Sequence, residues 1–192
     1  MRGFVLMCII SLAGSLNTRA TEAIQINDVF GKPHAPLDYK DKKATVLIFI
    51  THDCPIANAY APEIVRICNE FSEKGARIFL VHVDPDLKAD QAKKHAEEFG
   101  YKCPVLLDKN HALVKHAEAT ITPEAVVYSP EGSLKYRGRI DDQYKEIGKK
   151  RIHVTQRDLR DAIDAVLNGK EIKNSRTQAV GCFIPHLEGE RK

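Results

Sequence analysis

Apolar, β-branched runs alternate along the chain with stretches of helical spacing. The longer apolar runs cover residues 44–50 and 77–83, and shorter ones cover residues 105–107 and 125–128. Continuous runs of this kind are typical of strands that are buried on both faces of a sheet. We therefore expect these four segments to form the interior of one sheet.

Helical patterns lie between these predicted strands. Residues 57–74 carry apolar side chains on one face and stop at Gly75, and residues 87–99 do the same and stop at Gly100. A glycine directly after the last periodic residue is typical of a helix end. Alternation of strands and helices predicts a largely parallel central sheet with helices on both faces.

The pattern changes in the last third of the chain. The Ser-Pro-Glu-Gly turn at residues 129–132 predicts a hairpin in which residues 134–140 return antiparallel, so the sheet is expected to be mixed. An apolar stripe over residues 159–167 predicts a helix, and the Thr155-x-x-Asp158 pattern before it predicts a capping box. The expected class is an α/β fold that ends in a hairpin and a helix.

The first residues have the pattern of a cleaved signal peptide. Arg2 supplies a positive charge, residues 4–12 are apolar, and small and polar residues follow up to Ala20. The apolar stretch is too short to span a bilayer. We expect residues 1–20 to be a signal peptide and the protein to be periplasmic or extracellular, without stable membrane insertion. The alternatives are a loose N-terminal helix or a retained anchor.

The chain length indicates the number of domains, and the net charge bears on the expected partners. The chain has 192 residues, which suits one domain over residues 21–170 and a tail over residues 171–192. The formal net charge is only +3, and the basic residues are spread along the chain. This gives no electrostatic surface for nucleic acid, so we expect no nucleic-acid partner.

Four cysteines remain after the predicted leader, and they are Cys54, Cys68, Cys103 and Cys182. Disulfides persist in an oxidising compartment, and four cysteines permit three pairings among which the sequence does not choose. The chain has no Cys-x-x-Cys motif, which argues against a zinc ribbon and against a vicinal redox disulfide. We expect neither a metal nor another cofactor.

Cys54 is the main candidate for chemistry. It lies at the carboxyl end of the first predicted strand and just before Pro55, which favours the first turn of a helix. Free N–H groups at a helix start stabilise the thiolate, which is the reactive form of cysteine. The alternative is a buried structural cysteine.

Three neighbours of Cys54 invite separate interpretations. The Thr51 hydroxyl is close enough in sequence to reach the sulfur or a bound oxidant, and the alternative is a threonine that satisfies local backbone groups. His52 is interpreted as a solvated turn residue rather than a proton shuttle or a metal ligand. Asp53 is expected to cap the following helix.

The order of these motifs resembles the thioredoxin-like superfamily, specifically its redoxin branch of AhpC/TSA and peroxiredoxin-related proteins. The resemblance covers roughly residues 24–168. It rests on residues 46–49, Thr51-x-x-Cys54-Pro55, residues 104–108, Ile121-Thr122-Pro123 and residues 136–141.

The resemblance implies roles for individual residues. Cys54 is the attacking cysteine, and Thr51 is the threonine beside its sulfur. Pro123 is the cis-proline that faces the cysteine, and a cis bond leaves the Thr122 backbone free to face the thiol. Arg139 is a candidate for stabilising negative charge near the sulfur, and the alternative is an exposed hairpin arginine.

Two positions depart from the related families. Peroxiredoxins usually have a proline four residues before the threonine, where this chain has Leu47, so the departure weakens the case for a peroxide substrate. Thioredoxins have a second cysteine three residues after the first, where this chain has Ala57. Thiol chemistry at Cys54 therefore needs a remote resolving cysteine, a small thiol or a partner protein.

Cys182 is the candidate for the resolving cysteine, because it lies in a small apolar segment after a tail long enough to fold back over the sheet edge. The alternatives for Cys182 are an unpaired tail cysteine or a link to another chain. Cys103 is a second candidate resolver in a loop, and Cys68 is most simply a core residue on the apolar face of its helix.

These observations predict a thiol-based oxidoreductase that acts by thiol–disulfide exchange or peroxide reduction. Its expected partners are a protein or small-molecule thiol or disulfide, or a peroxide, together with an external thiol reductant. One alternative is copper delivery, because the motif around Cys54 is similar to copper-delivery proteins of the same fold; those have a Cys-x-x-x-Cys pair, and here residue 58 is Asn. A thioredoxin-fold interaction module without turnover is the other alternative.

Overall fold

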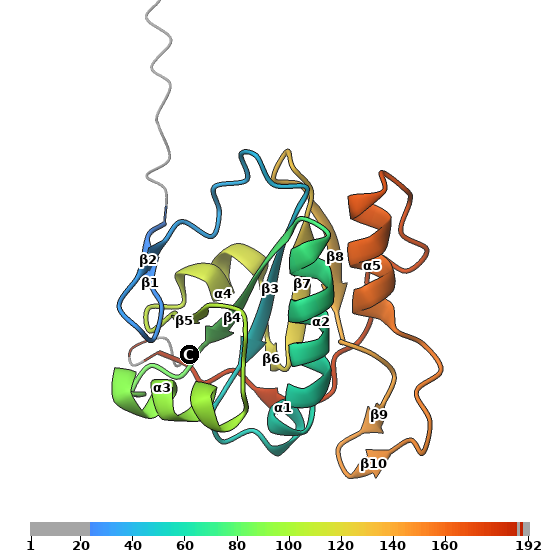
Figure 1. The fold of residues 1–192 in the computed structure, drawn as a ribbon. Helices are drawn as coiled ribbons and strands as arrows, with labels where there is room; N and C mark the ends of the chain where they lie inside the picture. Colours follow the sequence, from blue (N-terminus) through green and yellow to red (C-terminus); the bar gives the residue numbers. More distant parts are fainter. Residues whose placement is uncertain (1–23, 188, 190–192) are drawn as a thin grey trace, which may run out of the picture.

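A five-stranded mixed sheet forms the centre of the computed structural model, which describes residues 24–187 and 189 (Figure 1). The strand order is β5-β4-β3-β7-β8, with parallel pairing from β3 to β5 and antiparallel pairing from β3 through β7 to β8. The strands are β3 (Ala44–Ile50), β4 (Ala76–His82), β5 (Val105–Leu107), β7 (Glu124–Tyr128) and β8 (Leu134–Gly138). The predicted mixed α/β sheet is confirmed.

Helices cover both faces of this sheet (Figure 1). They are α1 (Pro55–Ala59), α2 (Ala61–Glu73), α3 (Ala89–Glu98), α4 (Ala112–Ala117) and α5 (Asp158–Leu167). One apolar cluster joins a sheet face to α2, α3 and α5, and a second cluster joins the other face to α4. All seven residues of β3 are buried, as its continuous apolar run predicts.

Three short antiparallel pairs lie outside the central sheet. They are β1 (Ile26–Asn27) with β2 (Pro33–His34), β9 (Tyr144–Glu146) with β10 (Lys149–Lys150), and β6 (Ile121–Thr122) with β11 (Cys182–Phe183). The last pair brings the C-terminal tail back to the edge where β3 ends. Within residues 24–187, no helix has the length and apolar character needed to cross a membrane.

The predicted signal peptide at residues 1–20 lies outside the described residues. Its cleavage and the domain boundaries at residues 21–170 and 171–192 therefore stay predictions.

The single helix predicted over residues 57–74 is wrong, because the structure has two helices there. Tyr60 lies between α1 and α2 with φ −83° and ψ −9°. Pro62 follows in the first turn of α2 and has no N–H for the carbonyl oxygen of Asn58. A continuous helix would lose that hydrogen bond, so a new helix begins instead.

The predicted capping box before α5 is also wrong. Arg157 is the N-cap residue of α5, and its side chain makes no capping hydrogen bond. The Thr155 hydroxyl and backbone N–H both donate to Asp142, at 2.5 and 2.8 Å. Burial alone would raise the pKa of Asp142, but hydrogen bonds from Thr155 and Gln156 outweigh it and lower the pKa to about 2. The buried carboxylate thus engages the threonine that was expected to cap the helix.

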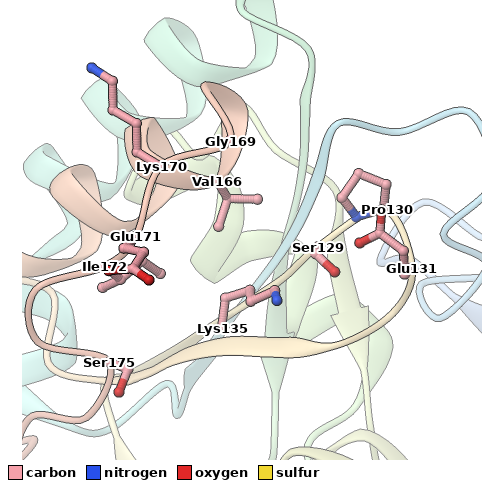
Figure 2. Close-up of a pocket in the computed structure, with 10 residues that line it drawn as sticks. All are labelled: Ser129, Pro130, Glu131, Lys135, Val166, Gly169, Lys170, Glu171, Ile172 and Ser175. Carbon is pink, nitrogen blue, oxygen red and sulfur yellow. The ribbon is translucent and has the colours of Figure 1, made fainter.

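A pocket of about 640 Å³ lies between the C-terminal end of α5 and the turn after β7 (Figure 2). Its walls include Ser129, Lys135 and Ile172. Because β7 runs antiparallel to β3 and Tyr128 pairs with Thr45, this pocket lies at the edge where β3 begins. Cys54 follows the other end of β3, so the pocket is not part of the thiol site.

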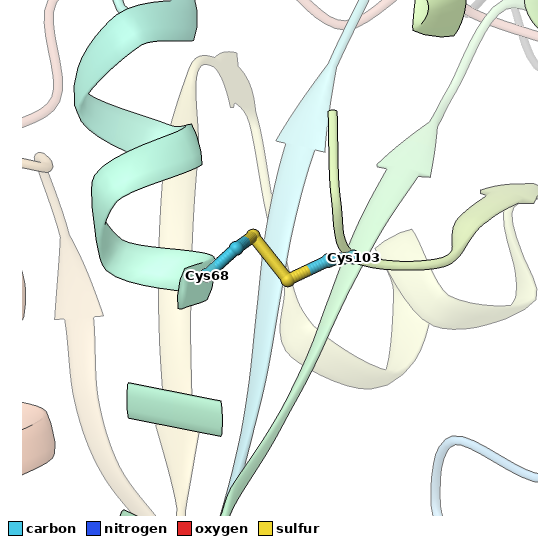
Figure 3. Close-up of a disulfide and its surroundings, with 2 residues drawn as sticks. All are labelled: Cys68 and Cys103. Atoms are coloured by element: carbon cyan, nitrogen blue, oxygen red, sulfur yellow. A yellow bond between two sulfur atoms is a disulfide. The ribbon is translucent and has the colours of Figure 1, made fainter. Parts of the chain in front are cut away.

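A disulfide joins Cys68 of α2 to Cys103 in the loop before β5 (Figure 3). The two Cα atoms are 5.7 Å apart, and both residues are buried. Cys68 is therefore more than a core residue, and the proposal of Cys103 as an alternative resolver for Cys54 is wrong because its sulfur is already bonded. Helical periodicity placed Cys68 in the core but carried no information about the loop that packs against it.

We expect replacement of both bonded cysteines, Cys68→Ser with Cys103→Ser, to lower the free energy of unfolding by roughly 3–4 kcal/mol. The bond closes a loop with a sequence separation of 35 residues, and removing it frees the unfolded chain. Urea unfolding measures the change. The rate of Cys54 alkylation in the folded variant is the control, and a loss below about 1 kcal/mol would contradict a stabilising role for the bond.

Candidate functional site

Cys54 lies in the turn between β3 and α1 and serves as the N-cap residue of α1. Its Sγ accepts a hydrogen bond from the Ala57 backbone N–H at 3.5 Å. Pro55 occupies the first helical turn, where its missing N–H has no cost. The prediction that Asp53 caps this helix is wrong, because Cys54 itself occupies the position next to Pro55. The arrangement directs helix N–H groups at the sulfur, which stabilises a thiolate.

The loop before β7 supplies the opposite wall of the site. The Thr122–Pro123 peptide bond is cis, as the family resemblance implies. The Cys54 thiol donates to the Thr122 carbonyl oxygen at 3.2 Å. Thr122 therefore faces Cys54 through its backbone, and Cys54 itself is only 1% exposed.

Cys182 lies beside the same threonine. Strand β11 pairs with β6 so that Cys182 is opposite Thr122, and the Thr122 hydroxyl donates to the Cys182 carbonyl oxygen at 3.4 Å. Burial, a hydrogen bond with Cys54, and the nearby charges of Cys54 and Asp53 raise the pKa of Cys182 to about 12. The two free cysteines of the described chain thus meet, although 128 positions separate them in the sequence.

Gly181 permits this close approach of the tail. A Cβ atom at this position would collide with the Thr122 carbonyl oxygen and press on the Ile121 side chain. The backbone of β11 can pair with β6 only because residue 181 has no side chain.

Thr51 is buried at the end of β3, and its hydroxyl lies 3.2 Å from the hydroxyl of Thr122. No hydrogen bond between Thr51 and the Cys54 sulfur is present among the described residues. The structure therefore brings Thr51 into the site through Thr122 rather than through the sulfur.

Arg139 is the one predicted site residue that lies elsewhere. Its Nε donates to the Asp158 carboxylate at 2.7 Å, and its guanidinium also contacts Gln156. Asp158 is the first residue of α5 and Gln156 lies just before the helix, so Arg139 joins the start of α5 to the end of β8. Its polar contacts within residues 24–187 do not include either free cysteine.

Among the described residues, one group of three offers ligand atoms close enough for a metal ion. His52, Asp53 and Asp84 place these atoms within 4.8 Å of one another. The group contains one imidazole and two carboxylates but no thiolate, which Cu(I) prefers. This group of three therefore gives no support to the copper alternative. Hydrogen bonds explain why His52 and Asp84 are in contact.

Two features of the site were not predicted. His52 is not simply solvated, because its backbone N–H and ring both contact the buried carboxylate of Asp84. Asn58 donates from its side chain to the His52 carbonyl oxygen at 2.9 Å. The sequence did contain a signal for these polar contacts. His82 is an ionisable residue at the end of an otherwise apolar strand, and such a residue needs buried polar partners.

The fold and this cysteine define a thioredoxin-like redoxin domain, with a thiol at a helix start opposite a cis-proline. The chain belongs to the AhpC/TSA family, whose family model matches residues 18–137. Cys54, Thr51 and Pro123 fall inside the matched range, and Cys182 falls outside it.

Solved structures support the same fold. A hypothetical protein from Sinorhizobium meliloti 1021 is 26% identical with a TM-score of 0.75, covering 86% of this chain and 92% of that chain. An uncharacterized conserved protein from Geobacillus kaustophilus is 28% identical with a TM-score of 0.77, covering 87% and 91%. A secreted Mycobacterium tuberculosis disulfide oxidoreductase homologous to E. coli DsbE has 17% identity and a TM-score of 0.51, covering 58% and 80%; that likeness shows the fold alone. A comparison with curated proteins gave no match.

We expect Gly181→Ala to expose Cys182, because the new Cβ forces β11 away from Thr122. Alkylation of Cys182 in the reduced protein should become about tenfold faster or more, as measured by mass spectrometry of timed samples. Gly100→Ala is the control for backbone strain without a collision, because a Cβ there meets no atom within 4 Å but the residue has φ +65°. Equal alkylation of Cys182 in the wild type and in Gly181→Ala would show that Gly181 does not hold the strand.

Proposed function

We propose that the protein is a thiol–disulfide oxidoreductase in which Cys54 is the nucleophile and Cys182 the resolving cysteine. The observation that carries the proposal is the contact of both free cysteines with Thr122 and with each other. Family membership and the fold support thiol redox chemistry in general. The pairing of Cys54 with Cys182 supplies the second thiol that the Ala57 position lacks.

The first step is attack by the Cys54 thiolate on one sulfur of a substrate disulfide. A new bond forms between the Cys54 sulfur and that sulfur, and the other substrate sulfur leaves as a thiolate that takes up a proton. The Ala57 N–H and the start of α1 support the negative charge before the attack. The product of this step is a mixed disulfide with Cys54.

The second step is attack by Cys182 on the Cys54 sulfur. The Cys182 thiol gives up its proton, the Cys54–Cys182 bond forms, and the remaining substrate thiolate leaves. The substrate disulfide has then gained two electrons and the cysteine pair has lost two. An external thiol reductant returns the pair to the reduced state by the same exchange chemistry.

The raised pKa of Cys182 supports Cys54 as the first nucleophile. Burial, and after it the hydrogen bond with Cys54, raises the pKa of Cys182 to about 12, so Cys182 stays protonated while Cys54 is reduced. A mixed disulfide at Cys54 removes the interactions with Cys54 but not the burial, so it lowers the pKa of Cys182 only in part. Cys182 thus becomes a better nucleophile after Cys54 has reacted.

Disulfide rather than peroxide is the substrate class that the site favours. The Thr51 hydroxyl is directed to Thr122, and Leu47 replaces the proline usual in peroxiredoxins. The Cys68–Cys103 bond suits an oxidising compartment, which supports export to the periplasm or cell exterior. The expected partner is a protein or small-molecule disulfide in that compartment.

We expect Cys54→Ser to abolish turnover of a model disulfide, because Cys182, the other free cysteine within residues 24–187, has a raised pKa and is a poor first nucleophile. Cys182→Ser should instead retain the first step and accumulate a mixed disulfide at Cys54. Intact-protein mass spectrometry of quenched reactions, with unreacted thiols alkylated, measures both outcomes.

The variant that lacks the Cys68–Cys103 pair is the control for these measurements and should turn over normally. Normal turnover by Cys54→Ser would reject the assignment of the nucleophile. A Cys182→Ser variant that turns over as fast as the wild type without added thiol would reject the resolving role.

Thr51→Val separates the two substrate classes. It removes the hydroxyl contact with Thr122 and should cost about 1 kcal/mol of stability. Because that hydroxyl does not contact the sulfur, we expect the rate with a disulfide substrate to stay within about threefold of the wild type. If the wild type reduces hydrogen peroxide faster than disulfides and Thr51→Val selectively loses that reaction, peroxide is the substrate instead.

A further inference from the structure

Five polar side chains form a closed ring of contacts beside the Cys54 turn. They come from the turn itself, α1, the end of β4 and α3, and they are His52, Asn58, His82, Asp84 and His95. His82 is fully buried, and His95 and Asp84 are 7% and 8% exposed. Buried polar atoms need partners of the opposite hydrogen-bonding type, so the ring restricts where protons can lie.

Asn58 sets the direction of the ring. Its Nδ2 donates to the His52 carbonyl oxygen at 2.9 Å, and a carbonyl oxygen only accepts. The Asn58 amide therefore turns its Oδ1 to His95 Nε2, at 3.0 Å. Since Oδ1 is an acceptor, His95 Nε2 must carry a hydrogen.

The position of the hydrogen on His95 determines which nitrogen of His82 must be a donor. Burial, followed by the charges of His82 and His52, lowers the pKa of His95 to about 4, so its ring is neutral at neutral pH. A neutral ring with a hydrogen on Nε2 has a bare Nδ1. That Nδ1 lies 3.2 Å from His82 Nε2, which must then be the donor.

Asp84 fixes the other nitrogen of His82. Its Oδ2 lies 3.3 Å from His82 Nδ1 and also accepts the His52 backbone N–H at 3.1 Å. Burial alone would raise the pKa of Asp84, but hydrogen bonds from His82 and His52 outweigh it and lower the pKa. An ionised Asp84 only accepts, so His82 Nδ1 also carries a hydrogen.

We infer that His82 is a buried imidazolium paired with Asp84, and that its ring of partners positions the Cys54 turn. His52 and Asn58 flank Cys54 on either side, and the ring ties both of them to the end of β4 and to α3. The positioning role rests on the proposed function of Cys54, whereas the protonation of His82 does not. These are positioning residues, since none of them contacts the sulfur among the described hydrogen bonds.

The surroundings of the ring contain few other ionisable groups. Tyr101 lies against His95, and burial raises the pKa of its phenol, so it stays neutral. Asp53 is exposed on the turn beside His52. Neither of these groups supplies the negative charge that faces His82, which comes from Asp84.

Two substitutions of Asn58 make opposite predictions for His82. Asn58→Ala removes the acceptor for His95 Nε2, so the His95 ring is free to place its hydrogen on Nδ1 and donate to His82. His82 then needs only one hydrogen and becomes neutral at neutral pH. Asn58→Gln keeps an uncharged amide oxygen as the acceptor for His95 Nε2 and adds no charge beside His95, so His82 should remain doubly protonated. A residue with only a packing role would make no such distinction.

The test uses the full reduced chain with ¹⁵N-labelled histidine. Long-range ¹H–¹⁵N spectra between about pH 6 and pH 8 report the hydrogens on each imidazole. We expect two hydrogens on His82 in the wild type and Asn58→Gln, and one in Asn58→Ala. A singly protonated His82 in the wild type at neutral pH, or the same state in both variants, would overturn the protonation of the ring.

The positioning role has a separate measurement. Asn58→Ala loses the amide donor to the His52 carbonyl oxygen, so its rate of Cys54 alkylation should change about threefold or more, and Asn58→Gln, which keeps an amide, should stay closer to the wild type. Asn168→Ala is the matched control, because Asn168 donates to a helix carbonyl oxygen in α5, away from the ring. Unchanged alkylation in Asn58→Ala would reject positioning of the turn while leaving the His82 result intact. Failure of turnover with intact ring signals would instead count against the proposed function.

Discussion

The burial of β3 at the centre of the sheet is the constraint on which the site depends. Its seven residues are enclosed by β4 on one side and β7 on the other, and helices cover both faces. The carboxyl end of β3 must therefore open into a turn between the neighbouring strands. Cys54 lies in that turn, the cis bond before β7 closes one side, and Asp84 after β4 closes the other.

Thr122 contacts both Cys54 and Cys182 at this edge of the sheet. Its carbonyl oxygen accepts the Cys54 thiol, its hydroxyl contacts Thr51, and its backbone aligns with Cys182. The tail strand covers the sulfur, and Cys54 is 1% exposed. Under the proposed function, a substrate reaches this sulfur by displacing β11, and a strand of two residues opens at little cost.

The described cysteines divide into two pairs with different surroundings. Cys68 and Cys103 are bonded in the interior, where they join α2 to the loop before β5. Cys54 and Cys182 are free and meet at the sheet edge, between a helix start and a short pair of strands. The bonded pair and the free pair therefore lie in different parts of the fold.

Several parts of this protein followed from local sequence pattern. The apolar runs of β3 and β4 predicted buried strands, and the Ser-Pro-Glu-Gly turn predicted the hairpin of β7 with β8. Cys54 and Pro55 predicted a thiol at the start of a helix. Each of these depends on residues close together in the chain, whose spacing and type are sufficient to specify the local conformation.

The tertiary structure decided which distant residues become partners. It paired Cys68 with Cys103, brought Cys182 onto Thr122, directed Arg139 to Asp158, and closed the ring that contains His82. A sequence lists the donors, acceptors and thiols but not the contacts among them. Those contacts follow from packing of the whole core, because it is the packing that sets which buried polar groups face one another and must satisfy each other.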